Sequence, residues 1–158
     1  MIICDINEVK VDVYATAAQS FIKGMEAIQN APKDDAFHTH ASGAASIAES
    51  WHPTKVPGKR YLAYAKSGDR VFGLAGLMIL SVEVSYVKVD YLCTHPFTSM
   101  AGVFLIKHAI KVSQDHGKGG TLRLYDASRS SFYDNLGFTS VGGGDKELTN
   151  GIIKEKNQ

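Results

Sequence analysis

The sequence predicts an α/β (α+β) fold in which a mixed, mostly antiparallel central sheet is flanked by helices. Short stretches of alternating apolar residues, typical of strands, are interleaved with longer stretches whose apolar residues recur at helical spacing. Residues 71–81 are almost continuously apolar, as in a central strand that is buried on both faces. The expected order of elements is therefore β-α-α-β-β-β-α-β-α-β.

Composition indicates an ordinary globular protein. The 158 residues suit one domain spanning 1–158, and 44% of them are hydrophobic. A formal net charge of +1 provides no global basic field, which argues against a nucleic-acid binder. Cys4 and Cys93 form no CxxC pattern. The apolar run 71–82 contains glycines and is too short to span a bilayer, and no signal-like segment opens the chain, so we expect a cytoplasmic protein without membrane partners.

The N-terminal part is expected to form one or two strands followed by two helices. Val9, Val11 and Val13 alternate with polar residues, which predicts strand structure over residues 2–14. Residues 15–30 carry apolar side chains at helical spacing and predict an amphipathic helix. A proline-containing break separates it from a second predicted helix at 38–51.

The middle of the chain is predicted to form three consecutive strands. The first covers 61–65 and ends at a hairpin turn, 67–69. The second is the apolar run 71–81, where Gly73 and Gly76 indicate a bulge or a close backbone approach. After a turn at 82–86, alternation predicts a third strand over 87–94, which the following His-Pro pair ends.

A short loop then leads from this strand into a helix that Thr98 or Ser99 can cap and Gly117 can end. Amides of a first helical turn have no partner within the helix, and the helix dipole favours an anion there. Ala101 and Gly102 keep the turn free of bulk, so a diphosphate could approach the backbone. An ordinary βα turn is the alternative interpretation.

The C-terminal part begins with a predicted strand at 121–125 and a short helix at 129–136. A last strand is expected to start at Thr139 and to be loosened by glycines 142–144. The tail from Lys146 onward is polar and is predicted to fray.

The predicted strand–loop–helix unit at 87–117 and the sequence FYDNLGF at 132–138 together resemble the two motifs of the GNAT N-acetyltransferase superfamily. Its acyl-coenzyme A motif is a strand with an acidic residue, a His-Pro or Val-Pro break and a glycine-rich loop that opens a helix. Its second signature, an aromatic-Tyr pair followed by Leu-Gly-Phe, matches the sequence FYDNLGF at 132–138. The resemblance covers 61–138 in order of elements, with its specific residues at 90–138. It implies a GNAT-like sheet in which two central strands splay and acetyl-coenzyme A wedges between them.

The resemblance also implies an activity, in which an acetyl group passes directly from acetyl-coenzyme A, as cosubstrate, to an amine acceptor in a ternary complex. Tyr133 would be the acid that protonates the departing thiolate, and Asp90 the general base, acting through water. The alternatives are a packed tyrosine with a surface hydroxyl, and a polar residue on a solvated strand face.

The resemblance assigns coenzyme binding to two groups of residues. The backbone of Cys93 and Thr94 would polarise the thioester carbonyl and pair with pantetheine, His95 would line the pocket, and the amides of Ser99, Met100, Ala101, Gly102 and Val103 would bind the diphosphate. Asp126 and Arg129 lie near the second motif, where the family often has Asn and Ala, and Arg129 could pair with a phosphate. The loop is shorter than usual, and Met100 stands where glycine is preferred.

Other functions are also compatible with the sequence. A catalytically weak or inactive GNAT-like interaction module would account for Met100 and the short loop. A GNAT-type toxin or effector acting on a macromolecule would need a basic rim, for which the candidates are Lys55, Lys59, Arg60, Lys88, Arg123 and Arg129. No metal is expected, because His38 and His40 have no suitably spaced third ligand. The acceptor would be chosen by residues 21–58, where Phe37 and Trp51 are candidate pocket residues, and a homodimer is left open.

Overall fold

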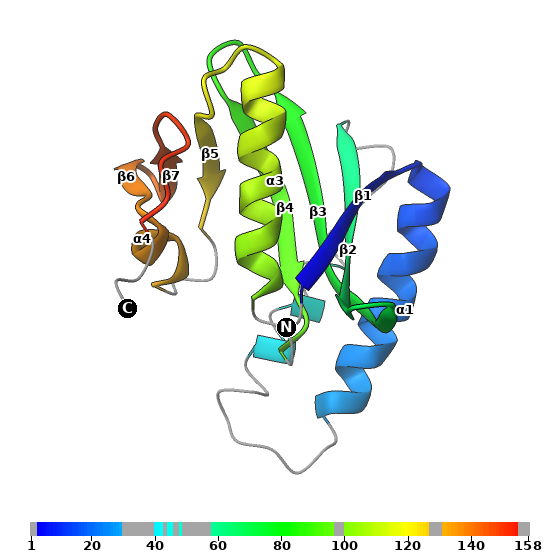
Figure 1. Cartoon of the computed structure of the whole chain (residues 1–158). Helices are drawn as coiled ribbons and strands as arrows, with labels where there is room; N and C mark the ends of the chain where they lie inside the picture. The colour runs from blue at the N-terminus through cyan, green and yellow to red at the C-terminus, as the bar shows by residue number, and fades with distance from the viewer. Residues whose placement is uncertain are drawn as a thin grey trace. The chain divides into compact units, whose positions relative to one another are not determined.

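The computed structural model describes residues 3–29, 40–42, 44, 45, 48, 58–96, 100–126 and 131–154. Its elements follow one another as β1 (Ile3–Val9), α1 (Val11–Gln29), β2 (Lys59–Ser67), β3 (Arg70–Val82), β4 (Val87–Thr94), α3 (Ala101–Asp115), β5 (Leu122–Tyr125), α4 (Phe132–Leu136), β6 (Thr139–Gly142) and β7 (Asp145–Leu148) (Figure 1).

The strands form a seven-stranded sheet in the order β1-β2-β3-β4-β5-β7-β6. β1 pairs with β2, and β7 pairs with both β5 and β6, in antiparallel fashion. β4 and β5 run parallel, with Val87 opposite Leu122 and Val89 opposite Leu124, and β4 continues to Thr94. The predicted mixed, mostly antiparallel sheet is confirmed.

The chain divides into two compact units. The first unit comprises Met1–Ile79 and Tyr91–Ile106, and the second comprises Leu80–Asp90 and Lys107–Gln158. β3, β4 and α3 each contribute residues to both units. Whether the two units behave as the single domain expected from the chain length stays a prediction.

The first unit is held by an apolar core. One face of α1 is buried because its apolar residues recur at helical spacing, and the helical residues among 40–48 add small side chains to the same cluster. The cluster consists of Tyr14, Ala18, Phe21, Ile22, Met25, Ala41, Ala44, Ala45, Ala48, Leu62, Leu77, Ile79 and Cys93. The helix predicted at 38–51 is helical at its described residues, and its remaining positions lie outside them.

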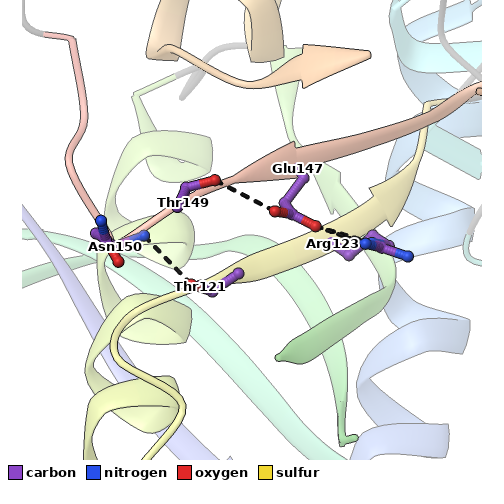
Figure 2. Close-up of polar contacts among 5 residues, drawn as sticks. All are labelled: Thr121, Arg123, Glu147, Thr149 and Asn150. Carbon is purple, nitrogen blue, oxygen red and sulfur yellow. Dashed lines mark hydrogen bonds and ion pairs between the residues drawn. The ribbon is translucent and has the colours of Figure 1, made fainter. Parts of the chain in front are cut away.

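The second unit combines buried strand residues with ion pairs. Val87, Val89, Leu122, Leu124 and Leu148 are all buried. On β5 and β7, Arg123 and Glu147 lie side by side with 2.6 Å between Nη2 and Oε2, while the Asn150 amide donates to Thr121 Oγ1 (Figure 2). The Arg123 guanidinium also lies 4.6 Å from the centre of the Tyr86 ring.

The predicted strand over 2–14 is wrong beyond Val9, because α1 already begins at Val11. The Tyr14 amide donates to the Lys10 carbonyl, and the Val13 amide donates to Asp12 Oδ1 near the start of the helix. Val11 and Val13 are exposed, whereas Tyr14 is 1% exposed. The helical spacing from Tyr14 onward therefore outweighs the short alternation of valines.

The predicted fraying from Lys146 is also wrong, because β7 occupies Asp145–Leu148 and pairs with both of its neighbours. Gly142, Gly143 and Gly144 have φ values of 108°, 61° and 85°, so they turn the chain from β6 into β7. Farther along, the Lys154 amide donates to the Leu136 carbonyl at 2.7 Å.

Candidate active site

The end of β4 is tightly built in the first unit. The His95 amide donates to the Ala75 carbonyl at 2.8 Å, which extends the pairing with β3. A Cβ on Gly76 would lie 3.0 Å from the Cys93 carbonyl oxygen, which confirms the predicted close backbone approach. Cys93 is 5% exposed, and burial raises the pKa of its thiol to about 12. A neutral, buried thiol suits the expected packing role rather than a nucleophile.

His40 reaches this strand end from the described part of residues 40–48. Its Nε2 atom lies 2.9 Å from the carbonyl oxygen of Thr94 and 3.2 Å from the Thr94 hydroxyl oxygen. In the sequence, His40 stands out only as the partner of His38 in a possible metal pair, and this contact was not predicted. The two residues are 54 positions apart, and no spacing signal links them.

His95 is the second histidine of this cluster. Its ring lies edge-on to Phe21 with centroids 6.5 Å apart. Burial, together with the nearby His40, lowers the pKa of His95 from its ordinary value. The neutral form of His95 is therefore favoured around pH 7.

The N-terminus of α3 follows this segment, and Ser99 lies outside the described residues. The Met100 carbonyl accepts from the amides of Val103 and Phe104 at 3.1 and 3.4 Å. The Val103 amide thus already has a local acceptor, whereas those of Ala101 and Gly102 precede any partner within the helix. Ala101 is 0% exposed, whereas Met100 is 41% exposed.

Asp90 lies on β4 within the second unit and is largely buried, with 15% of its side chain exposed. The Ser81 hydroxyl donates a hydrogen bond to its Oδ2, and the Lys88 ammonium lies 3.9 Å from its Oδ1. Burial raises the pKa of the Asp90 carboxyl, and Ser81 and Lys88 oppose that rise in part. A raised carboxyl pKa strengthens Asp90 as a proton acceptor.

Tyr133 is half-buried on α4. Its ring makes edge-on contacts with Phe132 and Phe138, with centroids 5.0 and 5.4 Å apart. The Tyr133 carbonyl accepts from the Phe138 amide, and Gly137 ends the helix with a φ of 107°. These backbone and ring contacts together hold the backbone and the ring of Tyr133 in position.

Asp126, predicted to bind the coenzyme, takes part in an ion-pair triad. The Lys146 ammonium lies 2.7 Å from Asp126 Oδ2 and 2.9 Å from Asp134 Oδ1. Only 1% of the Asp126 side chain is exposed. Both carboxylates raise the pKa of Lys146, with Asp126 contributing more. The triad links β7 to α4, the helix that carries Tyr133, while Arg129 lies outside the described residues.

The predicted site residues divide between the two units. Cys93, Thr94, His95, Met100, Ala101, Gly102 and Val103 belong to the first, and Asp90, Asp126 and Tyr133 to the second. Among the described residues, no cluster of three or more His, Cys, Asp or Glu side chains could hold a metal ion. None of the described helices has the length and apolar character needed to cross a membrane.

No protein-family model and no curated protein matches the chain. Solved structures do. A GNAT family acetyltransferase from Brucella melitensis in complex with acetyl-CoA is 13% identical, with a TM-score of 0.56 over 99% of this chain and 94% of that one. A PaiA N-acetyltransferase from Thermoplasma acidophilum in complex with coenzyme A is 15% identical, with a TM-score of 0.55 over 92% of this chain and 96% of that one.

A third structure, an acetyltransferase of the GNAT family from Staphylococcus aureus, is 14% identical, with a TM-score of 0.55 over 92% of this chain and 98% of that one. At such identities the likeness concerns the fold, and it extends over nearly the whole length of each protein. The GNAT-like architecture expected from the motifs is thus confirmed: this chain has the fold of the GNAT acetyltransferases.

Proposed function

We propose that this protein is an acetyl-coenzyme A-dependent N-acetyltransferase that transfers an acetyl group directly to an amine. The observation that carries the proposal is the passage from β4 into α3, with buried Ala101 at the first turn, in a fold shared with solved acetyltransferases that hold coenzyme A or acetyl-CoA. The small side chains of Ala101 and Gly102 support this role, because they would place no bulk between their amides and a diphosphate.

Proton transfer would fall to two residues of the second unit. An amine attacks only when it is neutral, and an ordinary lysine-type amine has a pKa of about 10.4. A protonated acceptor would first lose one proton to solvent; Asp90, with its raised pKa, would then take the second proton, from the nitrogen that has attacked the thioester, directly or through water. Acetyl-coenzyme A would supply the acetyl group as a thioester.

The departing thiolate needs a proton in return, and Tyr133 would donate it. A tyrosine hydroxyl with an ordinary pKa of about 10 is protonated at neutral pH. Its ring contacts and the α4 backbone hold Tyr133 in place before the reaction. One proton is taken up by Asp90 and one is released by Tyr133, so the transfer leaves the protein with no net change in protonation.

Calorimetric titration with coenzyme A and with acetyl-coenzyme A tests the proposal. We expect dissociation constants in the micromolar range and, with a panel of amines, release of free thiol. Met100→Gly should tighten binding if the Met100 side chain hinders the diphosphate. Absence of binding at millimolar coenzyme would overturn the enzyme assignment in favour of a GNAT-like module that has kept the fold for another interaction.

A macromolecular acceptor finds less support in the basic residues considered for it. Arg60 is 5% exposed and donates to the Gly58 carbonyl, while Lys59, Lys88 and Arg123 lie beside Glu8, Asp90 and Glu147. Lys55 and Arg129 lie outside the described residues. These carboxylates offset the positive charge that a nucleic-acid partner would need, so we propose a small-molecule or peptide amine as the acceptor.

A further inference from the structure

We infer that His40 is a positioning residue that holds the end of β4 in the shape needed for coenzyme binding, an inference that rests on the proposed function. The bond from Nε2 to the Thr94 carbonyl establishes the donor, because a carbonyl oxygen can only accept. The inference accordingly assigns the proton of His40 to Nε2, the tautomer in which the Thr94 carbonyl accepts. The same N–H lies within reach of the Thr94 hydroxyl oxygen, so one donor contacts two atoms of one residue.

Alternation along the strand shows which way the Thr94 backbone points. The His95 amide donates to Ala75 of β3, and a Cβ on Gly76 would meet the Cys93 carbonyl oxygen. Main-chain groups of successive strand residues point to opposite edges. Those of Thr94 consequently point away from β3, where they could meet the pantetheine that the family resemblance assigns to this part of the backbone.

The His40 bond supplies a partner for a carbonyl that has little access to water. Thr94 is 9% exposed and the bond itself is part-buried, and a carbonyl that loses its hydrogen-bond partner in such a place destabilises the conformation that contains it. Because Nε2 also lies near Oγ1, the imidazole approaches from the side-chain face of Thr94 rather than in the plane of the sheet. A carbonyl oxygen has two lone pairs, so the in-plane direction stays available to another donor.

His40 is held by packing as well as by this bond. Ala41, Ala44 and Ala45, which follow it on the same helical stretch, are buried in the apolar core of the first unit. The core thereby sets the position of the imidazole, and the imidazole sets the position of Thr94. Burial lowers the pKa of the neighbouring His95, which favours the neutral form of that ring at this strand end.

The test compares three variants by coenzyme A titration and thermal denaturation. His40→Phe keeps a ring but removes the donor, and we expect coenzyme A to bind about tenfold more weakly, with a lower Tm. His40→Gln restores an N–H donor and should bind within about threefold of the wild type. His116→Phe makes the same exchange at an exposed histidine and should change neither quantity.

Wild-type binding combined with equal or tighter binding by His40→Phe would overturn the inference and leave the proposed function standing. Tighter binding would mean that His40 competes with the coenzyme rather than preparing its site. No binding by the wild-type protein would overturn the proposed function and the inference together.

If His40→Phe does not fold, nitrogen NMR of the wild-type histidines decides, with the His40 signals assigned by their loss in His40→Gln. The inference requires a protonated Nε2 whose hydrogen bond persists when coenzyme A is added at saturation. Loss of that bond on addition would overturn it.

Discussion

The two compact units of this protein are stabilised in different ways. In the first unit, burial shifts three ionisable groups toward their neutral forms, because it raises the pKa of the Tyr14 hydroxyl and of the Cys93 thiol and lowers that of His95. The Lys66–Asp5 ion pair of this unit is partly exposed. In the second unit, charges are kept and paired, as in Lys146 with Asp126 and Arg123 with Glu147. The proposed coenzyme-binding residues belong to the first unit, and the proposed proton donor and acceptor belong to the second.

This difference has a physical consequence. Apolar burial changes little with pH, whereas ion pairs weaken when salt screens them or when a partner is neutralised. The stability of the second unit should therefore depend more on salt and pH than that of the first. The following experiments test that division, beginning with the largest expected effect.

Removing the proposed acid should affect chemistry and spare binding. We expect Tyr133→Phe to lower kcat by about a hundredfold or more, the usual contribution of a general acid, with little change in KM for acetyl-coenzyme A. Steady-state kinetics measure both. Tyr125→Phe is the matched control, because this tyrosine of the same unit is 63% exposed. Equal turnover of Tyr133→Phe and the wild type would remove Tyr133 from the mechanism.

Removing one lysine at a time should show that an ion pair with a buried carboxylate stabilises the protein more than one with an exposed carboxylate. Lys146→Met takes the ammonium away from the buried Asp126 carboxylate, and we expect Tm to fall by about 10 °C. Lys66→Met removes a pair with Asp5 in the first unit, where 57% of the Asp5 side chain is exposed, and should lower Tm by about 2 °C or less. Calorimetric melting compares the variants. A similar fall in Tm for both would show that the Lys146–Asp126 pair stabilises the protein no more than the exposed Lys66–Asp5 pair.

Two glycines of the first unit offer a test of its packing. A Cβ on Gly76 would lie 2.9 Å from Leu105 Cδ1, so Gly76→Ala should destabilise the protein by about 1–3 kcal/mol. Gly24 lies inside α1 with no heavy atom within 4 Å of such a Cβ, so Gly24→Ala should stabilise it by about 0.5–1 kcal/mol. Denaturant unfolding measures both free energies. A Gly76→Ala protein as stable as the wild type would show that the neighbours of Gly76 can move to admit a Cβ at no cost in stability.

Asp90→Asn should give the smallest change in stability and should depend on pH. Burial raises the folded-state pKa of Asp90, so ionising it costs free energy in the folded protein. The wild type should therefore lose stability relative to Asp90→Asn as pH rises through the folded-state pKa, and the difference should level off below the ordinary carboxyl pKa of about 3.9.

Denaturant unfolding of both proteins across this range measures the effect. A stability difference that does not vary with pH would show that the pKa of Asp90 is not raised in the folded protein. In the assay, the same variant should flatten the rise of rate with pH if Asp90 is the base, and an unaltered pH–rate profile would exclude that role.

The sequence was informative where a pattern repeats within one element. Alternation and an unbroken apolar run located β2, β3 and β4 to within a few residues, and helical spacing located α1 from Ala15 onward. It was misleading at Val11 and Val13, where three alternating valines are compatible with either structure, and at Lys146, where the strand depends on partners. Only pairing with β5 and β6 makes a strand of Asp145–Leu148.

The sequence by itself determined the class of the sheet, the strand–loop–helix unit that ends β4, and the aromatic motif of α4, because each is written in neighbouring residues. Tertiary structure alone decided which distant groups meet. His40 reaches Thr94, and Lys146 reaches Asp126 and Asp134, over separations that carry no local signal. Backbone preferences act over a few residues, whereas hydrogen bonds and ion pairs form wherever the folded chain brings donor and acceptor together.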